Sequence, residues 1–238
     1  MKLSEGYPLN QLYSKIYKRY DLINRIFTFG NDQKWRKKAS EICLENNPQR
    51  VLDLCCGTGD LAFSLYKESL GKTEIIGCDF NLNMLSIAER KAKKNKFKDI
   101  QFIQGNAADL PFSDSHFDCI TIGFGIRNLT FENPLSISHL KEMHRVLKNN
   151  GRLIILESSV PENKFIRFFH YIYLQFILIP VGGLISGNWE AYRYLAHSSS
   201  NFFNFNLFKE MIENERFTFL SHRKFIFGAA NILVFTKK

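Results

Sequence analysis

A glycine-rich segment at residues 50–60 carries the residue types best suited to chemistry in this chain of 238 residues. It reads Arg-Val-Leu-Asp-Leu-Cys-Cys-Gly-Thr-Gly-Asp, a short apolar run followed by a glycine turn. Gly57 and Gly59 allow the backbone to approach a ligand closely, because neither has a Cβ. Open α/β sheets bind nucleotides in loops at the carboxyl ends of parallel strands. The segment therefore predicts a buried strand, a nucleotide-binding turn that includes Thr58, and a helix capped by Asp60.

Two acidic residues bear on which nucleotide binds there. Asp53 lies inside the predicted strand, where its carboxylate can accept hydrogen bonds from the loop or contact a cationic amino acid group. A pyrophosphate is disfavoured beside Asp53, because both groups are negatively charged. The alternative role of Asp53 is structural, to brace the glycine turn. Asp79 ends the next predicted strand and can accept hydrogen bonds from both ribose hydroxyls. Its alternative role is to cap the helix that begins near Asn81.

A third polar segment follows the next predicted strand. Asn106 and Ala107 lie in a turn whose side chain and backbone can hydrogen-bond the edge of an adenine ring, with Pro111 and Phe112 fixing the loop. Residues 57–62 also match the dinucleotide pattern G-x-G-x-x-G/A, which alone would allow an NAD enzyme. Together, the three segments favour a site for a single nucleoside.

Alternating elements must position these residues. An alternation of short apolar runs with helical patterns predicts βαβ units and a mostly parallel, Rossmann-like sheet with helices on both faces. The predicted strands are 50–55, 74–79, 100–104, 117–122 and 151–157, and the predicted helices are 60–69, 81–95 and 134–148, the last ended by Asn149-Asn150-Gly151. A helix at 204–214 and an antiparallel hairpin of strands 217–227 and 229–236 complete a seven-stranded sheet.

The whole chain, 1–238, is expected to form one domain of ordinary size with two additions. N-terminal helices occupy residues 1–48, with helical patterns at 9–28 and 32–45. An insertion at 160–203 is expected to cover the carboxyl ends of the strands as a lid. Its strongly apolar part is expected to break at Pro180, Gly182 and Gly183 and, because polar residues interrupt it, not to span a membrane.

Composition limits the partners and the compartment. The net charge of +9 favours an anionic partner such as a phosphate, a nucleic acid or an acidic membrane surface, with a solvated basic surface as the alternative. The five cysteines form no C-x-x-C pair and predict small buried residues in a reducing compartment. No signal peptide pattern is present, so a cytoplasmic location is expected, with the inner face of the membrane as a second site. No metal site is predicted.

Five segments resemble class I S-adenosylmethionine-dependent methyltransferases: residues 52–60, 77–85, 106–112, 117–120 and 144–151. Residues 123–128, Gly-Phe-Gly-Ile-Arg-Asn, are similar to the C-methyltransferases of quinone biosynthesis. So are residues 20–24 with Phe29-Gly30 and Trp35-Arg36, and residues 191–195. The resemblance covers nearly the whole chain. It implies S-adenosyl-L-methionine as cofactor and C-methylation of a prenylated quinol, demethylmenaquinol in menaquinone biosynthesis. The alternatives are the ubiquinone precursor and another small aromatic or lipid substrate.

The same resemblance implies residue roles. Arg127 and Asn128 are expected to be catalytic, Arg127 by orienting and stabilising a phenolate rather than as an ordinary base. Its alternative role is structural pairing with Glu157 or Asp109. Gly123 is expected beside the cofactor, where relatives often carry a small hydroxyl residue. Residues expected to line the substrate pocket are Tyr20, Tyr192 and Phe169. His197 stands where many relatives have Glu, and is the weaker candidate for a base.

Other functions are less consistent with the sequence. A nicotinamide dehydrogenase is disfavoured by Asp53 and by the absence of a Tyr-x-x-x-Lys pair. A nucleic-acid methyltransferase is disfavoured because the segment after the fourth predicted strand lacks an Asn-Pro-Pro-Tyr motif, so no nucleic acid partner is expected. A non-enzymatic membrane-surface protein would leave the three nucleoside features unexplained. The aromatic residues of 165–180 are expected to accept a polyprenyl tail and contact the membrane surface, or to form a core or homodimer interface.

Overall fold

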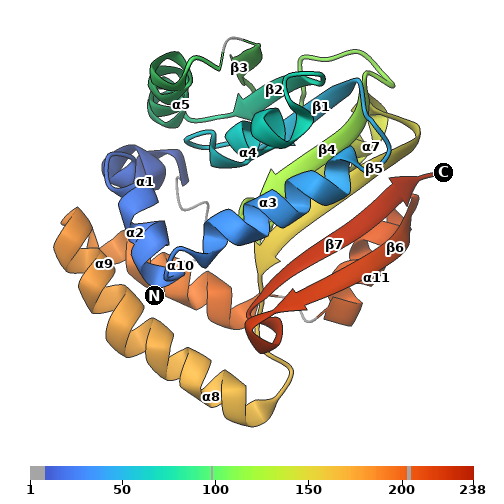
Figure 1. Cartoon of the computed structure of the whole chain (residues 1–238). Helices are drawn as coiled ribbons and strands as arrows, with labels where there is room; N and C mark the ends of the chain where they lie inside the picture. The colour runs from blue at the N-terminus through green and yellow to red at the C-terminus, as the bar shows by residue number, and fades with distance from the viewer. Residues whose placement is uncertain (1–8, 98, 203–204) are drawn as a thin grey trace.

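The computed structural model describes residues 9–97, 99–202 and 205–238 (Figure 1). Seven strands form one mixed sheet in the order β3-β2-β1-β4-β5-β7-β6. Neighbouring strands from β3 to β5 are parallel, and β7 pairs antiparallel with both β5 and β6. The predicted Rossmann-like fold is confirmed. The strands are β1 Arg50–Leu54, β2 Glu74–Asp79, β3 Ile100–Gln104, β4 Phe117–Gly123, β5 Leu147–Ser158, β6 Phe217–Phe225 and β7 Ala230–Lys237.

Successive residues of the central strands pack on opposite faces, because strand side chains alternate with a period of two. Val51 packs under α3 Asn31–Leu44, α4 Asp60–Ser69 and the end of α5 Leu82–Asn95. Leu52 packs on the other face, under α6 Ile126–Thr130, α7 Ser136–Val146 and α11 Phe205–Asn214. Both β1 residues are fully buried, so the sheet has an apolar core on each side.

A third apolar cluster is formed by helices. Figure 1 shows these helices beyond the carboxyl ends of the parallel strands. Leu12 of α1 Leu9–Ile16 and Ile23 of α2 Tyr20–Phe27 are buried there against the insertion. The insertion contributes α8 Lys164–Tyr173, a π-helical turn η1 Leu174–Leu178, α9 Ile179–Ser186 and α10 Trp189–Asn201. The N-terminal helices and the insertion therefore form one helical layer at the edge of the sheet where nucleotides bind.

Three element boundaries differ from the sequence prediction. The expected helix 9–28 is broken at residues 17–19, where the amide of Arg19 turns back to Ile16, so that Leu22 and Ile26 are exposed. The helix expected at 134–148 covers 136–146, and Asn149-Asn150-Gly151 lies inside the longer strand β5. The pairing of β4 with β5 shifts register at Phe117/Cys119, and this irregularity accommodates the extra strand residues. Residue 204 of the expected helix 204–214 lies outside the described residues.

The hairpin at the end of the chain also differs in detail. The expected strands 217–227 and 229–236 are β6 and β7, joined by a 3₁₀ turn over Ile226–Gly228. Gly228 adopts a φ of 94°, a conformation that favours glycine at this turn.

Residues 164–186 form one continuous helical segment, so the predicted break at Pro180, Gly182 and Gly183 is wrong. The π-helical turn directly before Pro180 accommodates the missing amide hydrogen. A Cβ at Gly182 would collide with the ring of Tyr192, so this glycine permits close packing of α9 on α10. By length and composition alone, this segment is the one helix among the described residues that could cross a membrane. The expectation that it does not do so stays a prediction.

Candidate active site

Two adjoining cavities lie between the carboxyl ends of the strands and the helical layer. The smaller, of about 170 Å³, is lined by the glycine turn and the ends of β2 and β4. The larger, of about 420 Å³, is lined mainly by apolar residues of the helical layer. Tyr13, Tyr20 and Phe124 line both cavities. A group bound in one cavity would therefore face a group bound in the other across these three rings.

The glycine turn adopts the conformation that its sequence predicts. Gly57 has φ 54° with open space where a Cβ would stand, and it lines the smaller cavity. Gly59 has φ 85°, and a Cβ there would meet the ring of Phe63 at 2.8 Å. The turn therefore requires glycine at position 59 both for its conformation and for space.

Asp60 does not cap the helix as expected. It is the first residue of α4, and Gly59 occupies the cap position without a side-chain hydrogen bond. The Asp60 carboxylate instead binds Arg25 at 2.6 Å and Lys91 at 2.9 Å. Thr58 Oγ1 donates to Asp21 Oδ1 at 2.5 Å. These bonds attach α2 to the glycine turn, a linkage that no local sequence pattern indicates.

Asp79 lies at the end of β2 and lines the smaller cavity. Its Oδ2 accepts from the amide of Gly57 at 2.8 Å, and its Oδ1 accepts from the amide of Asn81 at 2.9 Å. Burial raises its pKa, and these amide hydrogen bonds oppose the rise. The cap of α5 is Asn81, whose Oδ1 accepts from the amide of Met84. Asp79 therefore holds the glycine turn against β2 and is not the helix cap.

Asp53 lies beneath the turn and lines neither cavity. It is fully buried, and its Oδ1 accepts from Thr121 Oγ1 at 3.2 Å. Its Oδ2 has no hydrogen-bond partner in the described part of the chain. Burial raises the pKa of Asp53 to about 7, although the positive charge of Arg36 opposes the rise. A buried, unpartnered carboxylate oxygen is costly unless something cationic binds it.

Some of the remaining predicted cofactor residues line the smaller cavity, and others do not. Asn106, Ala107 and Gly123 line the smaller cavity together with Gly57 and Asp79. Asn106 Oδ1 accepts from the amide of Ala108, which fixes its turn. Thr58, Gly59 and Asp53 do not line the cavity.

Arg127 is the first charged residue after β4 and lines the larger cavity. It is 3% exposed, and its Nη1 donates to Ser158 Oγ at 2.9 Å and to Ser199 Oγ. Glu157 accepts from the backbone amide of Arg127, and no carboxylate among the described residues lies within ion-pair distance of the guanidinium. The pairing with Glu157 or Asp109 considered for it is therefore not formed. Its Nε is buried without a partner in the described chain.

Asn128 follows Arg127 but lines the smaller cavity. Its Nδ2 donates to Tyr13 Oη at 2.8 Å, and its Oδ1 accepts from Tyr194 Oη at 3.4 Å. Burial raises the pKa of Tyr13 well above its ordinary value, so its hydroxyl stays protonated near neutral pH. Asn128 thus connects α1 to α10 at the wall between the cavities.

Tyr20, Tyr192 and Phe169 all line the larger cavity, as the substrate prediction requires. His197 lines neither of the two cavities and hydrogen-bonds Asn201 on its own helix. Its geometry therefore gives no support to the role of base.

Two residues of the larger cavity were not predicted as site residues. Arg36 is 6% exposed and lies with its guanidinium carbon 5.1 Å from the ring centre of Phe124. His170 lines the same cavity, and burial lowers its pKa. The sequence gives no sign of this role for Arg36, because a single Arg on a helix does not show which cavity it faces.

The chain is similar in sequence to known proteins. The chain matches the ubiE/COQ5 methyltransferase family over residues 1–237. It is 43% identical to the demethylmenaquinone methyltransferase of Thermotoga maritima over 94% of this chain and 93% of that one. Identity is 41% with the protein of the same name from Thermus thermophilus, over 94% and 98% of the two chains.

Solved structures share the fold at low sequence identity. A S-adenosylmethionine-dependent methyltransferase from Aquifex aeolicus superposes with a TM-score of 0.56 at 17% identity, covering 79% of this chain and 81% of that chain. A protein from Pyrococcus horikoshii superposes with a TM-score of 0.59 at 21% identity, covering 82% and 84%.

Proposed function

The chain belongs to the ubiE/COQ5 methyltransferase family, and from that premise we propose that it methylates a ring carbon of demethylmenaquinol in menaquinone biosynthesis. It is a methyltransferase that uses S-adenosylmethionine. The observation that carries the substrate assignment is the match of nearly the whole chain, helical layer included, to relatives named demethylmenaquinone methyltransferase.

The residues of the smaller cavity fit S-adenosylmethionine. Asp79 would accept from the ribose hydroxyls, and Asn106 with Ala107 would contact the adenine edge. The unpartnered Oδ2 of buried Asp53 is suited to a cationic group at the base of the turn. Gly57 and Gly123 present backbone to the cavity without side chains in the way. When bound, the cofactor supplies a methyl group on a sulfonium.

The larger cavity fits a prenylated quinol. Its lining is mostly apolar, with Arg127 as a buried cation not neutralised by a carboxylate among the described residues. A ring carbon is a weak nucleophile until the neighbouring phenol loses its proton. Arg127 stabilises that phenolate and orients the ring, while Ser158 and Ser199 hold the guanidinium in place. Tyr20 and Phe124 exclude water at the junction of the two cavities.

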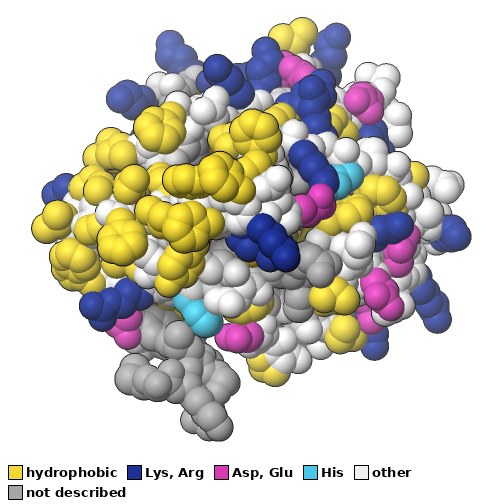
Figure 2. All heavy atoms as spheres, turned by 90° about the horizontal axis from the view of Figure 1, so that it is seen from below, with side chains coloured by type: hydrophobic (Ala, Val, Ile, Leu, Met, Phe, Trp, Pro, Cys, Tyr) yellow, Lys and Arg dark blue, Asp and Glu magenta, His cyan; other side chains and the backbone are white. Residues whose placement is uncertain are grey.

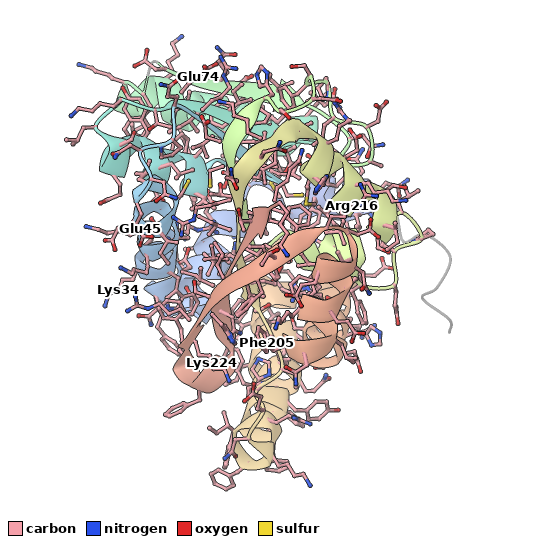
Figure 3. The ribbon with its side chains drawn as sticks, turned by 90° about the vertical axis from the view of Figure 1, so that its right-hand side faces the viewer. Lys34, Glu45, Glu74, Phe205, Arg216 and Lys224 are labelled. Atoms are coloured by element: carbon pink, nitrogen blue, oxygen red, sulfur yellow. The ribbon has the colours of Figure 1, made fainter. Side chains whose placement is uncertain are left out.

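The exposed side of the insertion supports contact with a membrane surface, where a prenylated quinol resides. Phe165, Phe168 and Phe176 are 71%, 59% and 72% exposed. Figure 2 views this side and shows hydrophobic side chains gathered over part of it, with Lys and Arg around them. Figure 3 shows the α8 end of the molecule extending beyond the sheet, near Lys224 of β6, which binds Glu162 at 2.8 Å. The net charge of +9 would favour anionic lipid.

The test is methyl transfer from labelled S-adenosylmethionine to two acceptors offered separately, reduced short-chain demethylmenaquinol and the demethylated ubiquinol precursor. The proposal expects label in the naphthoquinol product at a clearly higher kcat/KM. A preference for the benzoquinol would assign the chain to the ubiquinone reaction. No transfer to either, with cofactor binding intact, would overturn the substrate assignment.

A further inference from the structure

Ser158, the last residue of β5, connects the larger cavity to a further, polar cavity. The polar cavity has a volume of about 460 Å³ and is lined by residues of β5, β6, β7, α10 and α11, among them Glu157. Phe205 and Lys224, labelled in Figure 3, also line it. Ser158 is the one residue, of those the structure describes, that lines both cavities. A group bound in the larger cavity can therefore reach the polar cavity through this side chain.

Hydrogen bonds run from Arg127 through Ser158 to Glu157. Arg127 Nη1 donates to Ser158 Oγ at 2.9 Å, and Ser158 Oγ donates to Glu157 Oε1 at 3.0 Å. A serine hydroxyl has one proton and two lone pairs. Its proton is directed to Glu157 and one lone pair accepts from Arg127, so the other lone pair can accept from a hydroxyl in the larger cavity.

Glu157 is a buried carboxylate that is held by uncharged donors. It is 3% exposed and accepts from the amide of Ser158 at 2.8 Å and from the amide of Arg127 at 3.2 Å, in addition to the Ser158 hydroxyl. In the described part of the chain, no cationic side chain lies within ion-pair distance of it. Its charge acts on the hydroxyls of Tyr20 and Tyr194, which line the larger cavity. A proton that reaches Glu157 would neutralise a buried charge.

The polar cavity gives Glu157 a path to solvent. Asn231 is the partner of Glu157 in the pairing of β5 with β7, and its Oδ1 is hydrogen-bonded to His222 Nε2 at 2.8 Å. Glu162 and Lys224 stand at the rim with side chains that are 66% and 46% exposed. A cavity with such polar walls is suited to water. A proton on Glu157 can therefore leave without passing back through the apolar larger cavity.

Methylation of a quinol carbon requires such a path, because the reaction releases one proton. Arg127 cannot accept it, since a guanidinium stays protonated in proteins. Asp32 also lines the larger cavity, but its carboxylate is bound by Arg25. The remaining titratable group of that cavity with an ordinary pKa near neutral is His170, for which no hydrogen bond joins it to Arg127 among the described residues. Ser158 and Glu157 are the pair that contacts the cation.

We propose that Ser158 relays the proton of the quinol hydroxyl to Glu157, which releases it into the polar cavity. The proposal deepens the proposed function and rests on its quinol substrate. The phenol O–H bond breaks, Ser158 Oγ takes that proton, and the proton of Ser158 moves to Glu157 Oε1. The electron pair left on the phenol oxygen moves into the ring as the ring carbon bonds to the methyl group, and the pair of the broken carbon–sulfur bond stays on sulfur. The hydrogen of the methylated carbon then moves to the oxygen and the ring is aromatic again, so one proton leaves per turnover.

The test measures kcat for short-chain demethylmenaquinol in variants of the two serines that hold Arg127. Ser199→Ala is the matched control, because Ser199 accepts from the same guanidinium nitrogen and lines the larger cavity but not the polar one. Ser158→Ala is expected to lower kcat about 10²-fold, at least about tenfold more than Ser199→Ala, and Ser158→Thr to restore most of the rate. Calorimetry is expected to give wild-type affinity for S-adenosylmethionine in all three, because neither serine lines the smaller cavity.

A second substrate separates proton transfer from positioning. A halogenated analogue whose phenol is already ionised at the assay pH has no proton to give up. With this analogue, the excess loss of Ser158→Ala over Ser199→Ala is expected to disappear. Glu157→Gln is expected to match Ser158→Ala with both substrates. The double variant is expected to lose no more than either single variant, because both substitutions interrupt the same relay.

Equal losses in Ser158→Ala and Ser199→Ala would overturn the relay. So would an excess loss that persists with the ionised analogue, because that result indicates a positioning role alone. His170→Gln provides the competing case, and a loss in this variant that disappears with the ionised analogue would assign the proton to His170 instead. Wild-type protein that methylates no quinol would defeat the proposed function itself, whereas equal serine losses with wild-type turnover intact defeat the relay alone.

Discussion

The two cavities are built by different means. The smaller one is formed by strand ends and one glycine turn, whose backbone is fixed by the parallel sheet. The larger one is formed mainly by helices that precede β1 or follow β5 in the chain and meet only in the folded protein. In our proposal the first cavity binds S-adenosylmethionine and the second binds the quinol. Substitutions should therefore affect cofactor binding and quinol turnover separately.

The sharpest separation is expected for Arg127. Arg127→Gln removes the buried cation proposed to face the phenolate in the larger cavity, and loss of such electrostatic stabilisation is expected to lower kcat by about 10²- to 10³-fold. Affinity for S-adenosylmethionine should stay at the wild-type value, because Arg127 does not line the smaller cavity. The control is Arg90→Gln, an exposed residue of α5. Steady-state kinetics measure kcat, and calorimetry measures the affinity for S-adenosylmethionine. A loss of cofactor affinity in parallel with kcat would contradict the separation of the two cavities.

Asp53 gives a pH-dependent effect on the cofactor side. Its pKa of about 7 in the folded protein exceeds the ordinary value, so the folded state binds this proton more tightly than the unfolded state. The free energy of unfolding therefore falls as pH rises from about 4 to 7 and then levels off. Asp53→Asn removes that fall. Without cofactor, it should gain about 2–4 kcal/mol relative to wild type on going from pH 5 to pH 8, since each pKa unit is worth about 1.4 kcal/mol.

Urea unfolding of both proteins at the two pH values measures this difference. Arg36 on α3 and Asp79 on β2 are the charged groups that influence Asp53, and both remain in the variant. Equal pH dependence in the two proteins would show that Asp53 is ionised throughout and that its surroundings are more polar than the structure indicates.

The glycine turn offers a matched pair of substitutions. Gly59→Ala places a Cβ against Phe63 in a left-handed conformation, whereas Gly57→Ala has the conformational strain alone. We expect about 3 kcal/mol lost from the free energy of unfolding for Gly59→Ala and about 1 kcal/mol for Gly57→Ala. Urea denaturation of the two variants provides the comparison. Equal losses would mean that Phe63 moves aside without cost.

The smallest effect on chemistry is expected at the exposed face of the insertion. Replacing Phe165, Phe168 and Phe176 by Ser should lower binding to vesicles containing anionic lipid at least tenfold, because each loses apolar area available to the membrane. Turnover of a short-chain, soluble quinol should change less than twofold. Leu70→Ser is the control, since Leu70 is 79% exposed at the opposite end of α4 from the cofactor turn. Unchanged vesicle binding would turn attention to a homodimer at this face.

The same contrast explains what could be predicted from the sequence. The sheet and the positions of Gly57, Asp79 and Asn106 follow from local patterns, because parallel strands bring their carboxyl ends to one edge. The larger cavity does not, because it depends on how α1, α2 and the insertion pack against one another. The stripe of Leu22 and Ile26 pointed to a core face that the break at residues 17–19 turns outward. The bonds of Asp60 with Lys91 and of Asp21 with Thr58 could not be predicted from the sequence, because the partners are 31 and 37 residues apart in the chain.

A crystal structure with S-adenosylhomocysteine and a demethylmenaquinol analogue tests the two-cavity account most directly. The account predicts the nucleoside beside Asp79 and Asn106, in the smaller cavity. The quinol ring should lie in the larger cavity, with its oxygen facing Arg127 and its reacting carbon toward the sulfur across Tyr20 and Phe124. A quinol ring outside the larger cavity, or one that turns its oxygens away from Arg127, would contradict it.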